Sequence, residues 1–429
     1  MKFFFYSLGC KVNSYEISCL KRQALCLGNE VTNDVKKADV IVINTCTVTQ
    51  MSSKKSRQKI RSFRRDNSKA VLIAMGCFTE EYLNESLFDL GADIALGNND
   101  KETIFSLLDE YQKNQKKILC NKVPRNKQLY PIFDKYPLIA SARPYVKIQD
   151  GCDAFCTYCI IPLVRGKSRS RKPFDVIDEI KTLVENGAKE IVITGIHIGL
   201  YGKDFKEPYT LSDLLELILK TFPDLPRVRI SSLEIMDVDD KFIALLKDNP
   251  RLASHLHLPL QSGSTNILKK MGRPYDQAMY LEKIRKIQKA RPGIAITSDV
   301  MVGFPTETEE DFLETVKVIT SVPFREIHVF PYSVRPNTRA TLYKDLDPAI
   351  KKERVKELLR LNQKLSEQYE EQYYGKEVEV LIEKIEDGLA YGHTDNYLYL
   401  AIPSSNHKVN DLVKVIFTKD NKRERYEED

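Results

Sequence analysis

Several features are absent from this chain of 429 residues, and each absence narrows what the protein can be. It contains no tryptophan, and no apolar run approaches the roughly 18 residues that identify a membrane-spanning helix. The apolar start, residues 1–6, is too short for a signal-peptide core, and no small-residue cleavage site follows it. We therefore expect a cytoplasmic protein with no membrane segment.

The overall composition is that of a folded protein. Hydrophobic residues make up 42% of the chain and charged residues 29%, which excludes disorder and fibrous repeats for most of its length. At about 150 residues per domain, the length suggests about three domains. Cytosolic thiols stay reduced, so we do not expect the nine cysteines to form disulfides. Those at motif spacing are expected to bind metal or take part in chemistry.

The net charge of +6 is small, but the basic residues are clustered. Residues 51–69 hold eight Lys or Arg and a single acid, Asp66. A second cluster lies in residues 165–172 and contains Arg165, Lys167, Arg169, Arg171 and Lys172. Such clusters suit a phosphate backbone, although a solvated basic surface is the alternative.

The first hundred residues alternate between strand and helix patterns, which predicts an α/β domain with a parallel sheet. We expect strands at residues 2–8, 39–44 and 70–75, and helices at 15–27 and 52–65.

A cysteine follows each of these strands: Cys10, Cys46 and Cys77. Parallel strands place their carboxyl ends at one edge of the sheet, where α/β sheets bind ligands. We expect the three thiols to converge there, unless they are unrelated small residues at strand ends.

The pattern repeats after a Pro- and Lys-rich stretch. Six further strands, with amphipathic helices between them, predict a partial (β/α)6 barrel, and a doubly wound sheet is the alternative. We place these strands at residues 145–149, 190–194, 228–232, 255–260, 295–301 and 326–330. A charged helix at 348–374 follows.

Four short alternating stretches then predict a small all-β barrel. The expected domains are an N-terminal domain at 1–112, a linker at 113–142, a barrel at 143–374 and the β-rich domain at 375–429.

The sharpest motif is CxxxCxxC, formed by Cys152, Cys156 and Cys159 directly after the first barrel strand. Three closely spaced thiolates suit a soft metal or an iron–sulfur cluster. Zinc is the alternative, but a closed zinc site needs four ligands, and no other Cys or His follows within twenty residues. Three ligands leave one iron of a 4Fe–4S cube open for a reactant.

This motif, at the first strand of a βα barrel, resembles the radical S-adenosylmethionine (SAM) superfamily. The motifs around the first three cysteines resemble the N-terminal domain of the methylthiotransferases, and the β-rich tail resembles their RNA-binding TRAM domain. The resemblance covers essentially the whole chain. The motifs that carry it are Leu8-Gly9-Cys10-Lys11-Val12-Asn13, Asn44-Thr45-Cys46-Thr47-Val48-Thr49, Gly76-Cys77, His257-Leu258-Pro259-Leu260-Gln261-Ser262-Gly263-Ser264, Met271-Gly272-Arg273, Gly303-Phe304-Pro305-Thr306-Glu307-Thr308 and Tyr332-Ser333-Val334-Arg335.

Two motifs are similar to the family branch that acts on N6-threonylcarbamoyladenosine at position 37 of tRNA. These are the Leu-Gly-Cys-Lys-Val-Asn stretch and residues 195–202, Gly-Ile-His-Ile-Gly-Leu-Tyr-Gly. The chain departs from the family at Asn337, where Gly is usual. Asn tolerates the left-handed backbone conformation, so we expect the turn to be kept.

The resemblance implies a radical mechanism. Cys152, Cys156 and Cys159 would hold a 4Fe–4S cluster whose open iron binds SAM, and reductive cleavage of SAM would yield the 5′-deoxyadenosyl radical that activates the adenine. A second cluster, on Cys10, Cys46 and Cys77, would carry or supply the sulfur, and another SAM the methyl group. The hard chemistry belongs to these cofactors, and no side chain beyond the clusters is expected to be catalytic.

The residues expected to bind SAM lie mostly at ends of barrel strands. Glu234 suits the SAM amino group or ribose, with a solvated surface carboxylate as the alternative. Arg273 suits either the SAM carboxylate or a tRNA phosphate. The complete predicted set is Tyr158, Thr194, Gly195, Ser232, Glu234, Gln261 and Arg273.

The remaining predictions concern partners and other side chains. We expect the tRNA anticodon loop as substrate, a flavodoxin- or ferredoxin-type electron donor, and a monomer. Cys19 and Cys26 are predicted to pack in a helix core, and Cys120 has no assigned role. His197 and His257 are predicted to be hydrogen-bonded rather than metal ligands. Tyr391, Tyr397 and Tyr399 would stack on bases or, more simply, fill the terminal barrel.

Three alternatives remain open at this stage. The same chemistry could act on isopentenyladenosine in tRNA or on a ribosomal protein. The chain could be a non-catalytic, metal-containing RNA-binding protein. The N-terminal cysteine trio could be only structural in a radical SAM enzyme.

Overall fold

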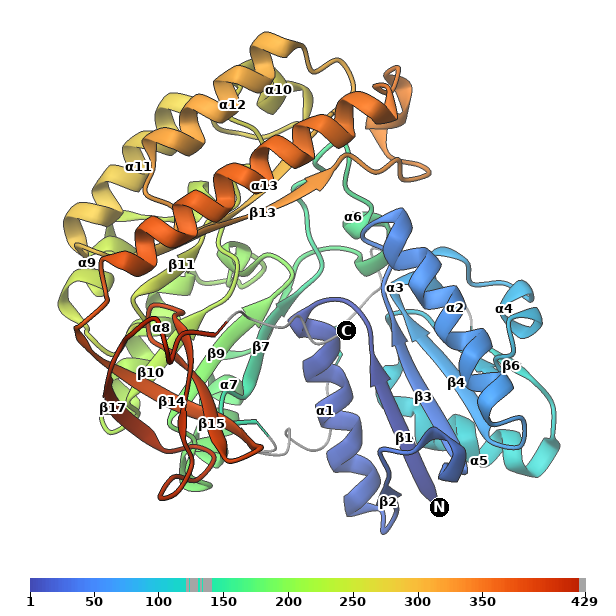
Figure 1. Cartoon of the computed structure of the whole chain (residues 1–429). Coiled ribbons are helices and arrows are strands. Elements are labelled where there is room, and N and C mark those ends of the chain that lie inside the picture. Colours follow the sequence, from blue (N-terminus) through green and yellow to red (C-terminus); the bar gives the residue numbers. More distant parts are fainter. Residues whose placement is uncertain (121–122, 124–129, 132, 134–140, 424–429) are drawn as a thin grey trace.

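A computed structural model describes residues 1–120, 123, 130, 131, 133 and 141–423. It contains a parallel sheet near the N-terminus, an arc of barrel strands and a small antiparallel sheet near the C-terminus (Figure 1). No helix in these described ranges is long and apolar enough to cross a membrane.

The N-terminal sheet has six parallel strands in the order β2-β1-β3-β4-β5-β6. Its strands alternate apolar side chains between two faces, and helices cover both. Helices α1 and α5 pack on the face that carries Phe3 and Val42, and α2, α3 and α4 on the face that carries Ile41. The elements are β1 (Lys2–Ser7), α1 (Lys11–Cys26), β2 (Glu30–Val31), β3 (Val40–Thr45), α2 (Gln50–Asp66), β4 (Val71–Gly76), α3 (Cys77–Glu81), α4 (Ser86–Asp89), β5 (Ile94–Ala95), α5 (Ile104–Asn114) and β6 (Ile118–Leu119).

Six parallel strands form the barrel, paired in two groups, β7-β9-β10 and β11-β12-β13. Single bridges at Val228–Leu252 and Ser232–His257 connect the groups. A further strand, β8, is antiparallel to β7. The strands are β7 (Tyr145–Asp150), β8 (Arg169–Ser170), β9 (Glu190–Gly195), β10 (Arg227–Ile230), β11 (His255–His257), β12 (Ala295–Val302) and β13 (Glu326–Pro331).

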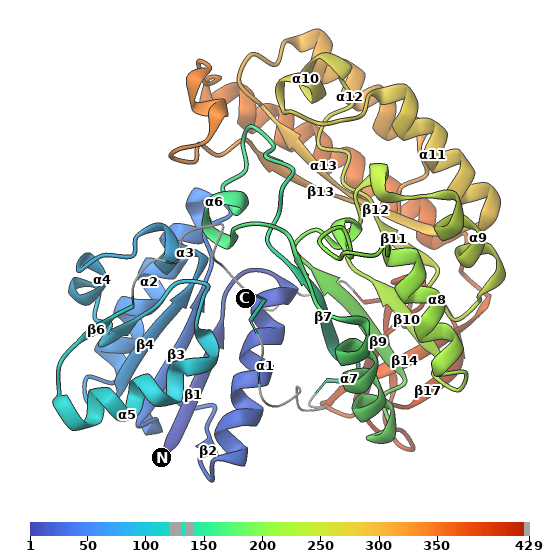
Figure 2. The same cartoon turned by 180° about the vertical axis from the view of Figure 1, so that it is seen from behind.

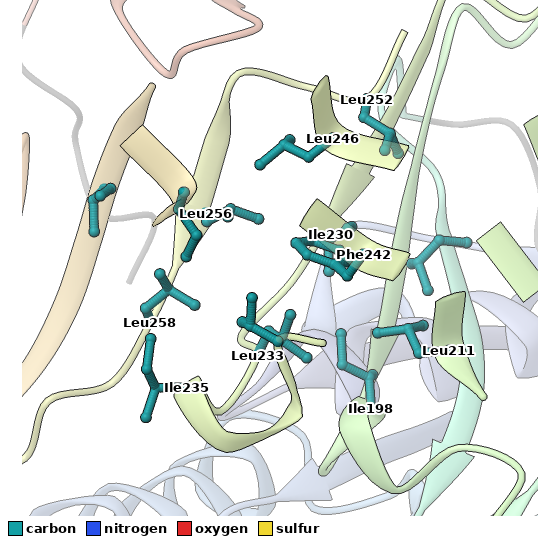
Figure 3. Close-up of a cluster of buried hydrophobic side chains, with 14 of the residues drawn as sticks. Ile198, Leu211, Ile230, Leu233, Ile235, Phe242, Leu246, Leu252, Leu256 and Leu258 are labelled. Atoms are coloured by element: carbon teal, nitrogen blue, oxygen red, sulfur yellow. The ribbon is translucent and has the colours of Figure 1, made fainter. Parts of the chain in front are cut away.

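Helices pack on the outside of the barrel over one large apolar core, part of which Figure 3 shows around Phe242 and Leu256. The long helix α13 lies along β13 (Figures 1 and 2). The helices are α6 (Ile161–Arg165), α7 (Pro173–Glu185), α8 (Leu211–Thr221), α9 (Asp240–Asp248), α10 (Thr265–Lys270), α11 (Gln277–Ala290), α12 (Glu309–Ser321) and α13 (Pro348–Glu371).

The C-terminal sheet is antiparallel, in the order β16-β15-β14-β17. Its strands are β14 (Glu377–Glu386), β15 (Leu389–Thr394), β16 (Tyr399–Pro403) and β17 (Leu412–Ile416). Arg229 of β10 ties it to the barrel by donating to the carbonyls of Thr394 and Asp395 at 3.0 and 2.8 Å. Glu190 of β9 holds that guanidinium from the other side at 2.6 Å.

The predicted fold class is confirmed: a parallel N-terminal sheet, a partial barrel and a small β-rich terminal unit all occur. All six barrel strands occur where the sequence predicts them, within three residues at either end. The domain boundaries stay a prediction, and most of the predicted linker, like the last six residues, lies outside the described residues. Asn337 has a φ of 64°, so the predicted left-handed turn is kept.

A buried ionic network joins the N-terminal part to the barrel. Glu16 of α1 accepts from Lys101 at 2.5 Å and from Lys147 of β7 at 3.0 Å. Arg165 of α6 reaches the same carboxylate at 3.2 Å and Asp150 at 3.0 Å. All five side chains are essentially inaccessible to solvent. These pairs hold helix α1 against β7. Both views show the two elements side by side.

Replacing Glu16 by Gln tests this network. Removal of the carboxylate leaves buried cations uncompensated, so we expect the free energy of unfolding to fall by about 3–5 kcal/mol at pH 7, measured by urea denaturation. The exposed pair Lys2–Glu30 supplies the control, since Glu30→Gln should change stability by less than about 1 kcal/mol.

The pH dependence provides a second measurement on the same variant. Burial alone would raise the pKa of Glu16, but Lys101, Lys147 and Arg165 hold that pKa well below its usual range. A lowered pKa in the folded state stabilises the protein above the unfolded value of about 4.3, and this contribution is lost as the pH falls. The stability difference between wild type and Glu16→Gln should therefore shrink below about pH 4.3. A difference that stays constant down to pH 3 would contradict the assignment.

Candidate functional site

The three N-terminal cysteines follow three adjacent strands. Cys10 follows β1, Cys46 follows β3, and Cys77 begins α3 directly after β4. Gly9, at a φ of +102°, lets the chain pass close to Cys46, because an added Cβ would lie 2.8 Å from the Cys46 Cβ and Sγ atoms. The thiols therefore converge at the carboxyl edge of the sheet, as the sequence predicts.

The electrostatics of this trio reflect burial and mutual proximity. Burial, together with the neighbouring Cys77 and Cys10, raises the pKa of the Cys46 thiol to about 12. Arg165 Nε donates to Cys77 Sγ at 3.3 Å, and Asn98 Nδ2 donates to the same sulfur at 3.6 Å. These donors favour the thiolate, which is the form that binds metal.

The second trio lies in the loop after β7. Burial, together with the neighbouring Cys156, raises the pKa of Cys152 to about 11 and that of Cys159 to about 12. Arg273 Nη1 donates to Cys156 Sγ at 3.2 Å, and the Ala154 N–H donates to Cys152 Sγ at 3.4 Å.

His197 lies beside the second trio. Its Nδ1 lies 3.5 Å from Cys152 Sγ, and its Nε2 lies 2.7 Å from an Asp237 carboxylate oxygen. The predicted hydrogen-bonded role of His197 is therefore confirmed. The second histidine, His257, makes a 2.9 Å contact from Nδ1 to Thr297 Oγ1, so it is hydrogen-bonded as well.

Both trios fit an iron–sulfur cluster by the chemistry of their donors. Each supplies three soft sulfur ligands, and each has an arginine N–H directed at a sulfur. Such a guanidinium compensates the negative charge of three thiolates and a bound cluster.

An ion pair links two of the predicted SAM-binding residues. Arg273 Nη2 pairs with the Glu234 carboxylate, and the same guanidinium contacts Cys156. A carboxylate and a guanidinium side by side complement the ammonium and carboxylate of an amino acid. Glu234 is thus not the solvated surface side chain of the alternative interpretation.

The other predicted SAM-binding residues have different surroundings. Thr194 is buried at the end of β9, and Gly195 is packed so tightly that an added Cβ would lie 2.9 Å from the Gln149 carbonyl oxygen. Ser232 bridges to His257 and is exposed. Gln261 has a left-handed backbone, φ 62°, and its buried Oε1 has no hydrogen-bond partner among the described residues.

A cavity of about 160 Å³ lies between the two parts of the chain. The loop that carries the second trio contributes Tyr158 and Cys159 to the cavity wall, and the loop after Cys46 contributes Val48 and Thr49. The remaining wall comes from barrel strand ends. The lining residues are Val48, Thr49, Tyr158, Cys159, Ile160, Ile161, Gln261, Asp299, Met301, Phe330, Pro331 and Ser333. The cavity thus lies between segments that carry both cysteine trios.

Three polar contacts hold this junction together beside the cavity. The backbone N–H of Gln50 donates to Ser333 Oγ at 3.0 Å. Arg335 Nη2 donates to Thr47 Oγ1 at 2.7 Å and also pairs with Glu81 of α3. The N-terminal part is therefore fixed to the carboxyl end of β13.

The interpretation of residues 165–172 as a phosphate-binding surface is wrong for three of its five basic residues. Arg165, Arg169 and Arg171 are buried, and each pairs with an acid: Arg165 and Arg169 with Asp150, and Arg171 with Glu179. Sequence reasoning missed their structural role because local charge density does not reveal burial. The sequence offered one local signal of this role, which is that the arginines follow closely after the loop with Cys152, Cys156 and Cys159.

The basic residues of α2 are on the surface, as the first cluster suggests. Lys54, Lys55, Arg57, Lys59 and Arg61 are exposed, while Arg64 pairs with Asp93. The helix begins beside the cavity, one residue after Thr49.

The cysteines outside the trios divide into two kinds. Cys19 is fully buried, as predicted, but Cys26 at the end of α1 is exposed, so its predicted core packing is wrong. The helix ends at that residue, and the neighbouring Leu25 and Leu27 are exposed as well. Cys120 is partly buried against the core that α1 and α5 cover.

Three comparisons place the chain among known proteins. The family model described as the radical SAM superfamily matches residues 146–319, and the model described as uncharacterized protein family UPF0004 matches residues 2–97. The fold is similar to a solved structure of the radical SAM methyltransferase TsrM from Kitasatospora setae with cobalamin and a [4Fe-4S] cluster bound. That likeness has a TM-score of 0.57 at 15% identity and covers 79% of this chain and 73% of the other.

Curated relatives match at higher identity. The threonylcarbamoyladenosine tRNA methylthiotransferase MtaB of Bacillus subtilis is 39% identical over 96% of this chain and 92% of the relative. MtaB of Aquifex aeolicus is 38% identical over 97% of this chain and 100% of the relative. The tRNA-2-methylthio-N(6)-dimethylallyladenosine synthase of Bacillus subtilis is 34% identical over 96% and 83%. With this identity over nearly its whole length, the chain belongs to the radical SAM methylthiotransferase family.

Proposed function

We propose that this protein is a tRNA methylthiotransferase that converts N6-threonylcarbamoyladenosine at position 37 to its 2-methylthio derivative. The observation that carries the proposal is the match to two MtaB enzymes at 38–39% identity over nearly the full length of all three chains. The geometry supports it, because one cavity lies between segments that carry two convergent cysteine trios.

In this proposal Cys152, Cys156 and Cys159 hold one 4Fe–4S cluster, and Cys10, Cys46 and Cys77 hold a second. The clusters supply, when bound, the electron that cleaves SAM and the sulfur that is inserted at carbon 2 of the adenine. Radical chemistry is required because that aromatic C–H has no acidity that a protein base can use.

The side chains of the chain bind and orient the reactants. Glu234 accepts from the SAM ammonium, and Arg273 donates to the SAM carboxylate, so the two groups exchange their mutual pairing for the zwitterion. Thr194, Gly195, Ser232 and Gln261 complete the SAM site in this proposal. Tyr158, which packs edge-on against Phe304, forms the wall between that site and the cavity.

The tRNA is proposed to bind across α2 and the C-terminal sheet, with the target base in the cavity. Single-stranded loop bases are recognised by stacking and edge contacts, and Tyr158 and Phe330 line the cavity for this purpose. We also propose cytoplasmic function, a flavodoxin- or ferredoxin-type electron donor, a monomer, and the domain boundaries that the sequence predicts.

The function is tested directly with reconstituted protein. After anaerobic loading with iron and sulfide, the enzyme receives SAM, a reductant and tRNA carrying either N6-threonylcarbamoyladenosine or isopentenyladenosine. Nucleoside mass spectrometry should show a methylthio group on the first substrate only. Gain only on the second would keep the chemistry and overturn the substrate, and SAM cleavage with neither product would point to a ribosomal protein.

The two-cluster assignment is tested by metal content. Wild type should bind about eight irons per chain, and Cys46→Ala and Cys156→Ala should each lose about four. Cys156→Ala should abolish SAM cleavage, whereas Cys46→Ala should cleave SAM without forming product. The exposed Cys26 lies outside both trios, so Cys26→Ala should retain full iron and activity. Stoichiometric zinc in place of iron, or full activity of Cys46→Ala, would contradict the assignment.

The basic face of α2 is tested by the salt dependence of tRNA affinity. Neutralised phosphates release counterions, so affinity should fall steeply with salt. The double variant Lys54→Gln, Arg61→Gln should flatten the slope of log K against log salt by about 1–2. Lys289→Gln on the exposed side of α11 is the control and should leave it unchanged. A flat wild-type dependence would count against tRNA as the substrate.

A further inference from the structure

Three side chains of the barrel interior form a polar cluster outside both cysteine trios. His257 comes from β11, Asp299 from β12 and His328 from β13, which are consecutive parallel strands. A nitrogen of each imidazole and a carboxylate oxygen of Asp299 all lie within 4.8 Å of one another. The two imidazole rings are 5.6 Å apart, centre to centre.

The strand register creates this cluster. Asp299 is the registered partner of His328, and His257 is the partner of Thr297, two residues before Asp299 on the same face of β12. Thr297 Oγ1 contacts His257 Nδ1 at 2.9 Å, and the other ring nitrogen of His257 lies 3.4 Å from the Asp299 carboxylate. Both histidines are therefore aimed at the same carboxylate.

The cluster lies two residues further into the barrel, along β12 and β13, than the apolar part of the cavity. Met301 and Phe330 are the next registered pair on the same face, and both line the cavity together with Asp299. Two residues along a strand span about 6.6 Å. A planar base held against Met301 and Phe330 would therefore have a polar layer about 6–7 Å further into the barrel.

The Asp299 carboxylate of this layer lies among nitrogen donors. Burial would raise the pKa of Asp299, but His257 and His328, and then Lys11, hold it below its usual range. Lys11 begins α1, directly after Cys10, and its charge acts on Asp299 from the N-terminal part. Two imidazoles thus flank the Asp299 carboxylate, and a second carboxylate, that of Glu326, lies 3.9 Å from His328 Nδ1.

We propose that His257, Asp299 and His328 form the subsite that binds the threonylcarbamoyl group of the substrate base, an inference that rests on the proposed function. This substituent carries a carboxylate, a hydroxyl and amide N–H groups. The imidazole N–H groups bind the carboxylate, and Asp299 accepts from the hydroxyl or an amide N–H. The extended substituent is about as long as one two-residue strand repeat.

This subsite also explains discrimination against an isopentenyl group. That substituent is apolar, so its insertion would leave a carboxylate and several N–H donors desolvated without partners. A site built to hydrogen-bond a polar group rejects an analogue that lacks it far more strongly than an apolar pocket rejects an extra methylene.

A divalent metal ion is the competing occupant, since two imidazoles and one carboxylate are a common ligand set. Asp299 lines the cavity together with Met301 and Phe330, the next registered pair, so the cluster faces the space proposed for the base. This position favours the substrate.

The test compares wild type with His328→Phe, which keeps an aromatic ring next to His257 and removes the N–H donor. Affinity is measured for the anticodon stem-loop with N6-threonylcarbamoyladenosine and for the same stem-loop with unmodified adenosine. We expect wild type to prefer the modified stem-loop, and His328→Phe to lose roughly tenfold or more of that preference. Affinity for the unmodified stem-loop, iron content and SAM cleavage should not change.

A second variant, Asp299→Asn, keeps the shape and should also reduce the preference. Glu310→Gln on the exposed surface of α12 is the control and should behave as wild type. If wild type methylthiolates the modified tRNA but both variants keep its preference for the modified stem-loop, the subsite is overturned and the function stands. If wild type forms no product on this tRNA, the proposed function itself fails. Stoichiometric bound zinc or another divalent metal that is lost in His257→Ala would assign the cluster to a metal and overturn the proposal.

Discussion

The Glu16 carboxylate and the cations around it are the interaction on which the rest of the structure depends. Glu16 belongs to α1, while Lys147 and Arg165 belong to the first strand and first helix of the barrel. An unpaired charge at this depth is strongly destabilising, so the two parts of the chain cannot separate without exposing or neutralising it. Arg165 also donates to Asn13 Oδ1 at 2.5 Å and to Cys77 Sγ. One guanidinium therefore fixes both the junction between the parts and the first cysteine trio.

The fold was largely predictable because its signals are local. Buried parallel strands such as β3 and β4 are nearly continuous apolar runs, and CxxxCxxC lies within eight residues of the chain. The convergence of Cys10, Cys46 and Cys77 followed from the rule that parallel strands end at one edge. Helix α9, of nine residues, lies between two of the predicted barrel strands, where amphipathic helices were expected, and it buries Phe242 and Leu246.

The site was less predictable where its contacts are distant in sequence. Arg165 and Glu16 are 149 residues apart, and Arg335 meets Thr47 across 288 residues. No local pattern distinguishes a buried arginine of this kind from a surface one, which is why the run from Arg165 to Lys172 suggested phosphate contacts. The same limit applies to the cluster of His257, Asp299 and His328, which depends on strand register.

The attachment of the C-terminal sheet has a mechanical consequence. Arg229 is fully buried and donates to two carbonyls of that sheet while Glu190 holds it from the barrel, so the joint has little rotational freedom. If RNA binds this sheet as proposed above, the joint would hold it at a constant distance from the cavity. The enzyme would then select a nucleotide by its position along the RNA as well as by its chemistry.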